Sequence, residues 1–173
     1  MAATAAWQED NGAATGSPSH GTTRGAATNT DWKSVDDTST ARASATIIAG
    51  QNSYHKYQYV KFTGTFNQIS AGLFAHTAGS LGTGLSLVDK ITSTYAAPAT
   101  TALSGSTDIT STTAIGSGQS VNFSTVGPEG ASPTSSITAA GYSQYIVTQL
   151  QTLATAAAGD VGDQTLTFQW NEN

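Results

Sequence analysis

Three histidines are the side chains of this sequence best suited to act as bases or metal ligands: His20, His55 and His76. A metal site brings several such ligands together, often at the short spacings H-x-x-x-H or His-x-x-Glu. The three histidines are far apart in the chain and show neither spacing. We therefore interpret them as structural residues, and the sequence predicts no metal site and no cofactor.

Carboxylates occur in two close pairs, Asp36 with Asp37 and Asp160 with Asp163. A glycosidase needs two carboxyl groups that face each other across a cleft, which neighbouring aspartates in polar loops do not suggest. The second pair has oxygens of the kind that bind calcium. It lacks the full ligand pattern of a calcium loop, so a solvated hairpin turn is the simpler interpretation.

A nucleophilic serine is not indicated either, because no Gly-x-Ser-x-Gly sequence stands at a strand-to-helix turn. The residues therefore predict no catalytic site, and we expect a protein that is not an enzyme. A binding or structural role is the expectation that remains.

The composition favours small polar residues. Alanine, glycine, serine and threonine make up more than half of the 173 residues. Only 10% are Asp, Glu, Lys or Arg, against about 25% in an ordinary soluble domain. The length suits one domain, or one domain with an arm.

Charge and hydropathy exclude two classes of partner. The net charge is −5 and the six cations are scattered singly, whereas a nucleic-acid binder needs a cationic surface that displaces phosphate counterions. No apolar run approaches the roughly 20 residues that span a bilayer, and the first ten residues do not resemble a secretory signal. We expect neither a nucleic-acid nor a membrane partner. The chain has no cysteine, so disulfides and thiolate metal sites are excluded.

Residues 1–42 differ from the rest of the chain. They are rich in Gly, Ser, Thr and Asn and show no period of 2 or 3.6, which predicts an extended N-terminal arm. An arm of this kind buries too little to offset its chain entropy. We expect it to be held either by its own body or by a neighbouring subunit.

Residues 43–173 read as short strands joined by Ser/Thr/Gly loops. In the strongest one, residues 54–67, Val60 and Phe62 alternate with Tyr57 and Tyr59, as in a half-buried strand. Further strands are expected at residues 45–50, 69–76, 85–88, 91–95, 121–123 and 166–170. The sum predicts an all-β fold, an antiparallel β-sandwich or jelly roll.

Residues 142–158 fit two structures. Apolar residues from Tyr142 to Leu153 follow the spacing of an amphipathic helix. The β-branched run Ile146-Val147-Thr148 and the turn-like sequence after Gly159 favour a strand instead. We expect the strand, paired with residues 166–170 in a C-terminal hairpin.

Aromatic residues are the remaining candidates for partner binding. Tyr57 and Tyr59 form either an exposed patch for a protein chain or a sugar, or the second buried face of a central strand. Trp7 and Trp32 lie in the polar arm. They either fill pockets on a neighbouring subunit, as interface hot spots do, or pack on their own domain.

Several segments resemble small structural proteins of tailed-bacteriophage particles. These segments are WQEDNG (7–12), GSP (16–18), NTDWKS (29–34), IAGQNSYHKY (48–57), FTGTFN (62–67), YIVTQLQ (145–151) and TLTFQWNE (165–172). The resemblance covers nearly the whole chain and assigns no functional residue.

The resemblance implies a β-rich virion protein, most simply a capsid decoration (cement) protein that stabilises contacts between major capsid subunits. Its expected partners are the major capsid protein and further copies of itself, a trimer being favoured, at the capsid surface. The alternatives are a neck or tail component, or a module on the virion surface that binds host glycans.

Overall fold

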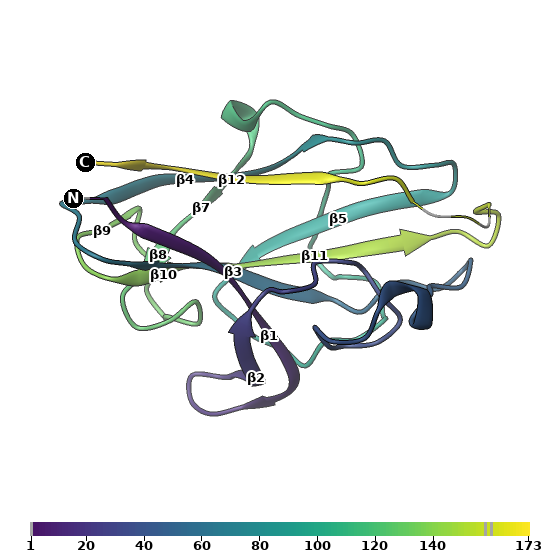
Figure 1. Cartoon of the computed structure of the whole chain (residues 1–173), viewed down its shortest axis with the longest axis horizontal. Coiled ribbons are helices and arrows are strands. Elements are labelled where there is room, and N and C mark those ends of the chain that lie inside the picture. Colours follow the sequence, from purple (N-terminus) through teal and green to yellow (C-terminus); the bar gives the residue numbers. More distant parts are fainter. Residues whose placement is uncertain (1, 158, 160) are drawn as a thin grey trace.

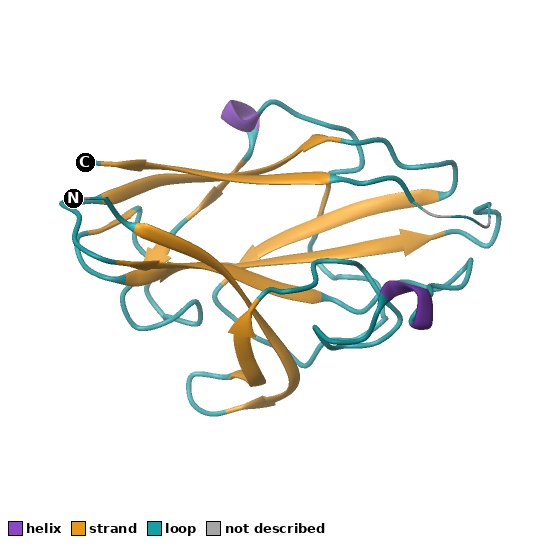
Figure 2. Cartoon of the chain, viewed as in Figure 1, coloured by secondary structure: helices purple, strands orange, loops and turns teal. Residues whose placement is uncertain are grey.

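The computed structural model describes residues 2–157, 159 and 161–173, which form an all-β protein (Figures 1 and 2). The helical elements of these residues are two single turns, η1 (Arg42–Ser44) and η2 (Ile115–Ser117). The strands are β1 (Thr4–Thr15), β2 (His20–Ala26), β3 (Lys56–Thr63), β4 (Ile69–Ala78), β5 (Leu85–Thr92), β6 (Thr107–Asp108), β7 (Gln119–Val121), β8 (Phe123–Ser124), β9 (Ser136–Ile137), β10 (Gly141–Ser143), β11 (Tyr145–Thr152) and β12 (Thr165–Glu172).

Two antiparallel sheets pack face to face, which confirms the predicted β-sandwich. Sheet A has eight strands: β2-β1-β3-β11-β5-β6 lie in order, β10 pairs with β3, and β8 pairs with β10. Sheet B has four strands, in the order β12-β4-β7 with β9 paired to β4. In Figure 1, β4 and β12 form the upper layer and β3, β11 and β5 the lower layer.

Alternate side chains of β3 build the core between the sheets. Val60 and Phe62 are buried together with Ile69 of β4 and Phe123 of β8. Each such side chain contributes about 1.5–3 kcal/mol on burial. The burial of Val60 and Phe62 on the same face confirms the alternation that the sequence predicts for this strand.

The opposite face of sheet A is buried as well. Tyr57 and Tyr59 of β3 meet Tyr145 of β11 edge to face, with ring centroids 5.5 and 5.6 Å apart. Tyr95 and Leu103, from the connection between β5 and β6, pack on these rings. Sheet A is thus covered by sheet B on one face and by a loop on the other.

The N-terminal strands belong to sheet A, so the prediction of an extended arm is wrong for residues 4–26. Of the two expected ways of holding this segment, the structure shows the first, by its own body. β1 pairs with β3 from Thr4 to Asp10, and β2 pairs back onto β1. No apolar period marks β1 because two of its central residues, Glu9 and Asp10, are charged. Both are nevertheless buried, each within a cluster of hydrogen bonds and ion pairs.

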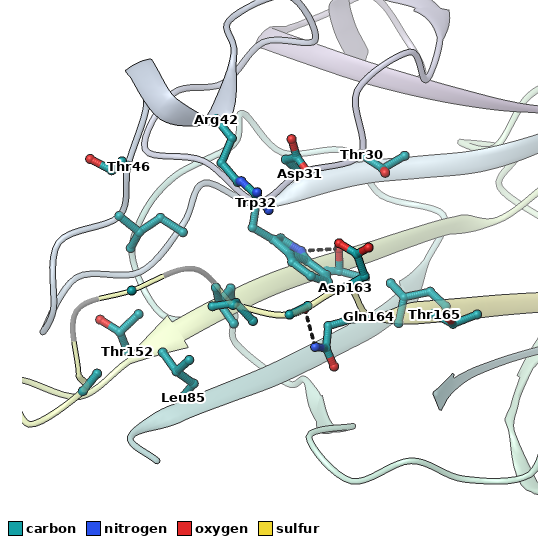
Figure 3. A pocket seen from close by; sticks show the side chains of 18 of the residues that line it. Thr30, Asp31, Trp32, Arg42, Thr46, Leu85, Thr152, Asp163, Gln164 and Thr165 are labelled. Carbon is teal, nitrogen blue, oxygen red and sulfur yellow. Dashed lines mark hydrogen bonds between the residues drawn. The ribbon is translucent and has the colours of Figure 1, made fainter. Parts of the chain in front are cut away.

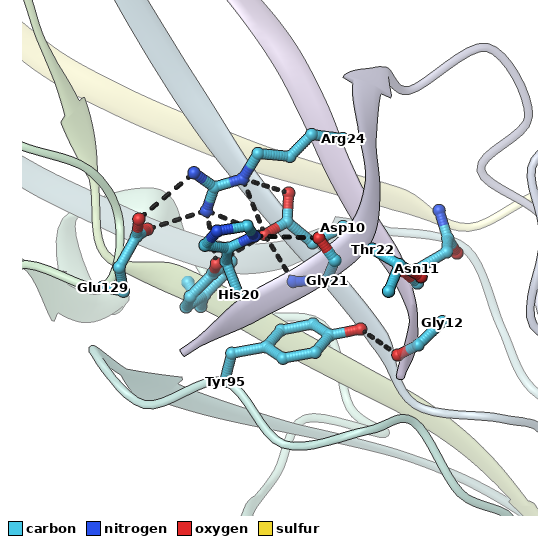
Figure 4. A network of polar contacts seen from close by, with 10 residues as sticks. Asp10, Asn11, Gly12, His20, Gly21, Thr22, Arg24, Tyr95 and Glu129 are labelled. Carbon is cyan, nitrogen blue, oxygen red and sulfur yellow. Dashed lines mark hydrogen bonds and ion pairs between the residues drawn. The ribbon is translucent and has the colours of Figure 1, made fainter. Parts of the chain in front are cut away.

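The Asp10 cluster lies on the outer face of sheet A (Figure 4). Arg24 of β2, directly opposite Asp10, donates to Asp10 Oδ2 at 2.9 Å and to Glu129 Oε2 at 2.8 Å. The Tyr145 hydroxyl donates to Asp10 Oδ2 at 2.6 Å. Burial lowers the pKa of Arg24, but its hydrogen bonds to Glu129 and Asp10 outweigh this and leave that pKa above its ordinary value. The guanidinium therefore stays charged between two carboxylates.

The Glu9 cluster lies on the inner face. Lys56 donates to Glu9 Oε1 at 3.0 Å and Gln58 donates to Glu9 Oε2 at 2.9 Å. In the amide orientation that satisfies both neighbours, Asn11 donates to Glu9 and to Asp36. Burial raises the pKa of Asp36. Removing one partner of such a buried pair costs more than the pair contributes, because the other charge is left uncompensated.

The C-terminal strands are only partly as expected. Residues 145–152 form strand β11, as predicted, but β11 pairs with β3 and β5, whereas β12 pairs with β4 in sheet B. The predicted hairpin of these two strands is therefore wrong. Residues 45–50 are not a strand either. The hairpin does not form because β3 and β5 already occupy the two edges of β11.

Breaking the Glu9–Lys56 pair tests this account of the N-terminal strand. Lys56→Met leaves the buried carboxylate of Glu9 without its cation, so we expect the free energy of unfolding to fall by about 3–5 kcal/mol, measured by urea titration. The double variant Glu9→Gln/Lys56→Met removes both charges and should lose less than Lys56→Met alone. Lys90→Met, at a partly exposed lysine, is the control. Equal losses for the single and double variants would contradict the pairing.

Candidate functional site

A large pocket opens between sheet A, the start of β12 and the connection from β2 to β3 (Figure 3). Its volume is about 1210 Å³, which is somewhat above the usual range for a small-molecule site, roughly 300–1,000 Å³. The apolar side chains of its lining come from distant parts of the chain. They include Trp7, Trp32, Ile47, Leu85, Leu150 and Leu166.

A hydrogen bond from its indole N–H fixes the orientation of Trp32 in this pocket. Its indole Nε1 donates to Thr148 Oγ1 of β11 at 3.0 Å. The neighbouring Lys33 is buried, and its ammonium donates to Asp37 Oδ1 and to the Thr40 carbonyl. Hydrogen bonds from the Thr40 side chain and backbone, and then from Lys33, lower the pKa of Asp37. A buried lysine thus holds the segment that carries the tryptophan.

Trp7 reaches the same pocket from β1. It lies opposite Val60 on the inner face of sheet A, and its ring meets Phe168 of β12 edge-on with centroids 6.2 Å apart. The side chain remains 36% exposed. The structure therefore brings the two predicted tryptophans together on their own domain, the second of the two alternatives that the sequence left open.

Polar side chains line the pocket as well. Thr30, Asp31 and Arg42 lie on one side, and Asp163 and Gln164 on the other (Figure 3). The carboxylates of Asp31 and Asp163 make no hydrogen bond or ion pair with another described residue. The pocket thus combines fixed aromatic surfaces with open acceptor groups.

The tyrosines that the sequence offered for partner binding are not on the surface. Tyr57 is 5% exposed and Tyr59 is 3% exposed, and both belong to the ring cluster on the outer face of sheet A. Burial raises the pKa of Tyr59 above its usual range. Of the two alternatives for these tyrosines, the exposed patch is wrong and the second buried face of a central strand is the one observed, because the connection between β5 and β6 covers this face.

The other residues singled out for chemistry are dispersed. His20, His55 and His76 each lie within hydrogen-bond distance of backbone carbonyl oxygens. Asp160 lies outside the described residues, whereas Asp163 lines the pocket. Within the described part of the chain, no three His, Asp or Glu side chains are grouped as ligands for one metal ion.

One buried carboxylate gave no signal in the sequence. Asp89 of β5 is fully buried and lies directly opposite Thr148, the residue that anchors Trp32. Gln119 donates to its Oδ1, while its Oδ2 has no partner among the described residues. Burial raises the pKa of Asp89 to about 6. An inward-facing aspartate is indistinguishable in sequence from an exposed strand residue.

A second candidate surface is the hairpin of β1 and β2, which projects from the sandwich (Figure 1). β2 is the last strand of sheet A, and its outer edge pairs with no strand of the described residues. Residues 22–26 are exposed. Apart from Arg24 they are small and uncharged, and the Arg24 guanidinium turns toward Asp10 and Glu129.

Comparison with family models, with curated proteins and with solved structures found no match. Among the described residues no helix has the length and apolar character needed to cross a membrane. The interpretation of both surfaces therefore rests on their own chemistry.

The buried Asp89 leads to a pH dependence of stability. Its pKa of about 6 in the folded protein lies above the ordinary value of 3.8, so the folded state binds this proton more tightly. Protonation of Asp89 therefore contributes to the free energy of unfolding, and this contribution is fully present below pH 4 and is lost as the pH rises through 6. Asp89→Asn should therefore be more stable than the wild type by on the order of 2 kcal/mol at pH 7.5, with a smaller difference at pH 4.5.

Urea unfolding at the two pH values measures this difference. Asp108→Asn is the control, because a hydrogen bond from Thr110 lowers the pKa of that exposed carboxyl, and its effect has the opposite sign. A stability difference between Asp89→Asn and the wild type that does not change with pH would contradict the assignment.

Proposed function

We propose that this protein is a non-enzymatic structural component of a tailed-phage particle, a capsid decoration (cement) protein. In this role it binds the major capsid protein at the capsid surface and associates with further copies of itself, a trimer being the favoured state. The resemblance of its sequence segments to small virion proteins supports this role. The β-sandwich with an open sheet edge supports it independently.

The observation that carries the proposal is the free edge of β2, whose one charged residue is paired within the same domain. Soluble proteins usually protect an edge strand with charged side chains, proline or a covering loop. Here the charge on β2, Arg24, is directed to Asp10 and Glu129. The remaining exposed residues leave backbone N–H and C=O groups open to pair with a strand of a neighbouring subunit.

The projecting hairpin thus takes the place of the flexible arm in the proposed contact. A flexible arm would lose conformational entropy when it binds, whereas this hairpin is already ordered by buried ion pairs. Preorganisation lowers the cost of association. A surface of this kind suits a protein that binds many identical sites on a particle.

The copy number of the protein in purified particles tests the proposal. Quantitative mass spectrometry against the major capsid protein should give an equal amount or a simple fraction of it. A few copies per particle would place the protein in the neck or tail, the alternative structural role. Absence from purified particles would overturn the virion role.

A charge on the free edge tests the contact itself. Thr23→Lys places a solvated cation on β2, so binding to capsids that lack the protein should weaken by about tenfold or more, equivalent to roughly 1.4 kcal/mol. Co-sedimentation measures binding, and thermal unfolding checks that the variant stays folded. Thr112→Lys, at an exposed threonine near η2 of the opposite layer, is the matched control. Undiminished binding by Thr23→Lys would exclude the edge as the contact.

A further inference from the structure

We propose that the pocket lined by Trp7 and Trp32 is a binding site for an oligosaccharide. The site is separate from the free edge of β2. Its function does not depend on where the protein sits in a particle, so the two proposals succeed or fail independently.

The two indoles supply the apolar part of the site. A pyranose ring has a face of C–H groups that packs on an aromatic plane, and tryptophan offers the largest such plane. The N–H of Trp32 is already bonded to Thr148, so its remaining contact surface is apolar and its orientation is set before a ligand arrives. Trp7 is held by Phe168 and stays partly exposed.

The polar lining supplies the complementary groups. A sugar hydroxyl donates one hydrogen bond and accepts others, so it is recognised by carboxylates, amides and hydroxyls placed around an apolar surface. Asp31 and Asp163 offer carboxylate oxygens without a partner among the described residues. Thr30 and Thr165 add hydroxyl groups to the lining. Each can take part without first breaking a hydrogen bond that stabilises the fold.

The same lining argues against other ligand classes. Among the described residues of the lining, Arg42 is the one cation and stands beside two carboxylates. A site for nucleotides or phospholipid headgroups would need several cations. A purely apolar ligand would make no use of the carboxylate oxygens of Asp31 and Asp163. The volume of about 1210 Å³ fits several linked sugar rings better than a single small metabolite.

A glycan array probed with the full chain, followed by calorimetry with the best oligosaccharide, tests the proposal. The wild type should bind at least one oligosaccharide and quench tryptophan fluorescence. Trp32→Ala and Trp7→Ala should each weaken binding by more than about tenfold, as loss of an aromatic anchor does. Asp163→Asn should weaken binding without altering thermal unfolding.

Two control variants separate binding from folding. Trp170→Phe changes the third tryptophan, which packs against Phe62 and Phe168 in the core, and should leave the affinity unchanged. Asp108→Asn is the control for Asp163→Asn. Absence of any bound oligosaccharide would overturn the proposal, as would full affinity in both Trp→Ala variants. Occupation of the pocket by an apolar probe or a peptide, with no saccharide bound, would overturn it too.

Discussion

The N-terminal strands depend on the ion pairs that two adjacent buried carboxylates, Glu9 and Asp10, form with cations of neighbouring strands. Successive side chains of a strand point to opposite faces, so these two neighbours lie on opposite sides of sheet A. Each is unfavourable to bury alone and requires partners. Lys56 and Gln58 compensate Glu9, while Arg24 and Tyr145 compensate Asp10. These ion pairs and hydrogen bonds fix the register of β1 against β3, although the sequence of β1 shows no apolar pattern.

Both candidate surfaces follow from this arrangement. The ion pairs of Arg24 with Asp10 and Glu129 leave the edge of β2 without an unpaired charge, which makes this edge suited to strand pairing. The same strand β1 places Trp7 on the inner face, opposite Val60. Sheet B ends at β12, so this part of the inner face has no strand above it. The pocket forms there, with Trp32 as its second aromatic residue.

Local patterns predicted those parts of the fold in which apolar residues alternate. The alternation of side chains in β3 predicted this strand and its inner face, and the series of short strands predicted the sandwich. Strand β11 was predicted from its β-branched run Ile146-Val147-Thr148, although its apolar spacing also fitted a helix. The pairing partners were not predictable. β12 joins β4 rather than β11, since the edges of β11 are already taken, and no local signal reports which edges are free.

The sequence by itself determined an all-β protein, its strongest strands and the four aromatic residues worth examining. Only the tertiary structure decided that Trp7 and Trp32 share a pocket while Tyr57 and Tyr59 are buried. It also decided that residues 4–26 are strands rather than an arm. The physical reason is common to these cases: burial of a side chain and compensation of a charge depend on residues distant in the chain, which the pattern of nearest neighbours does not contain.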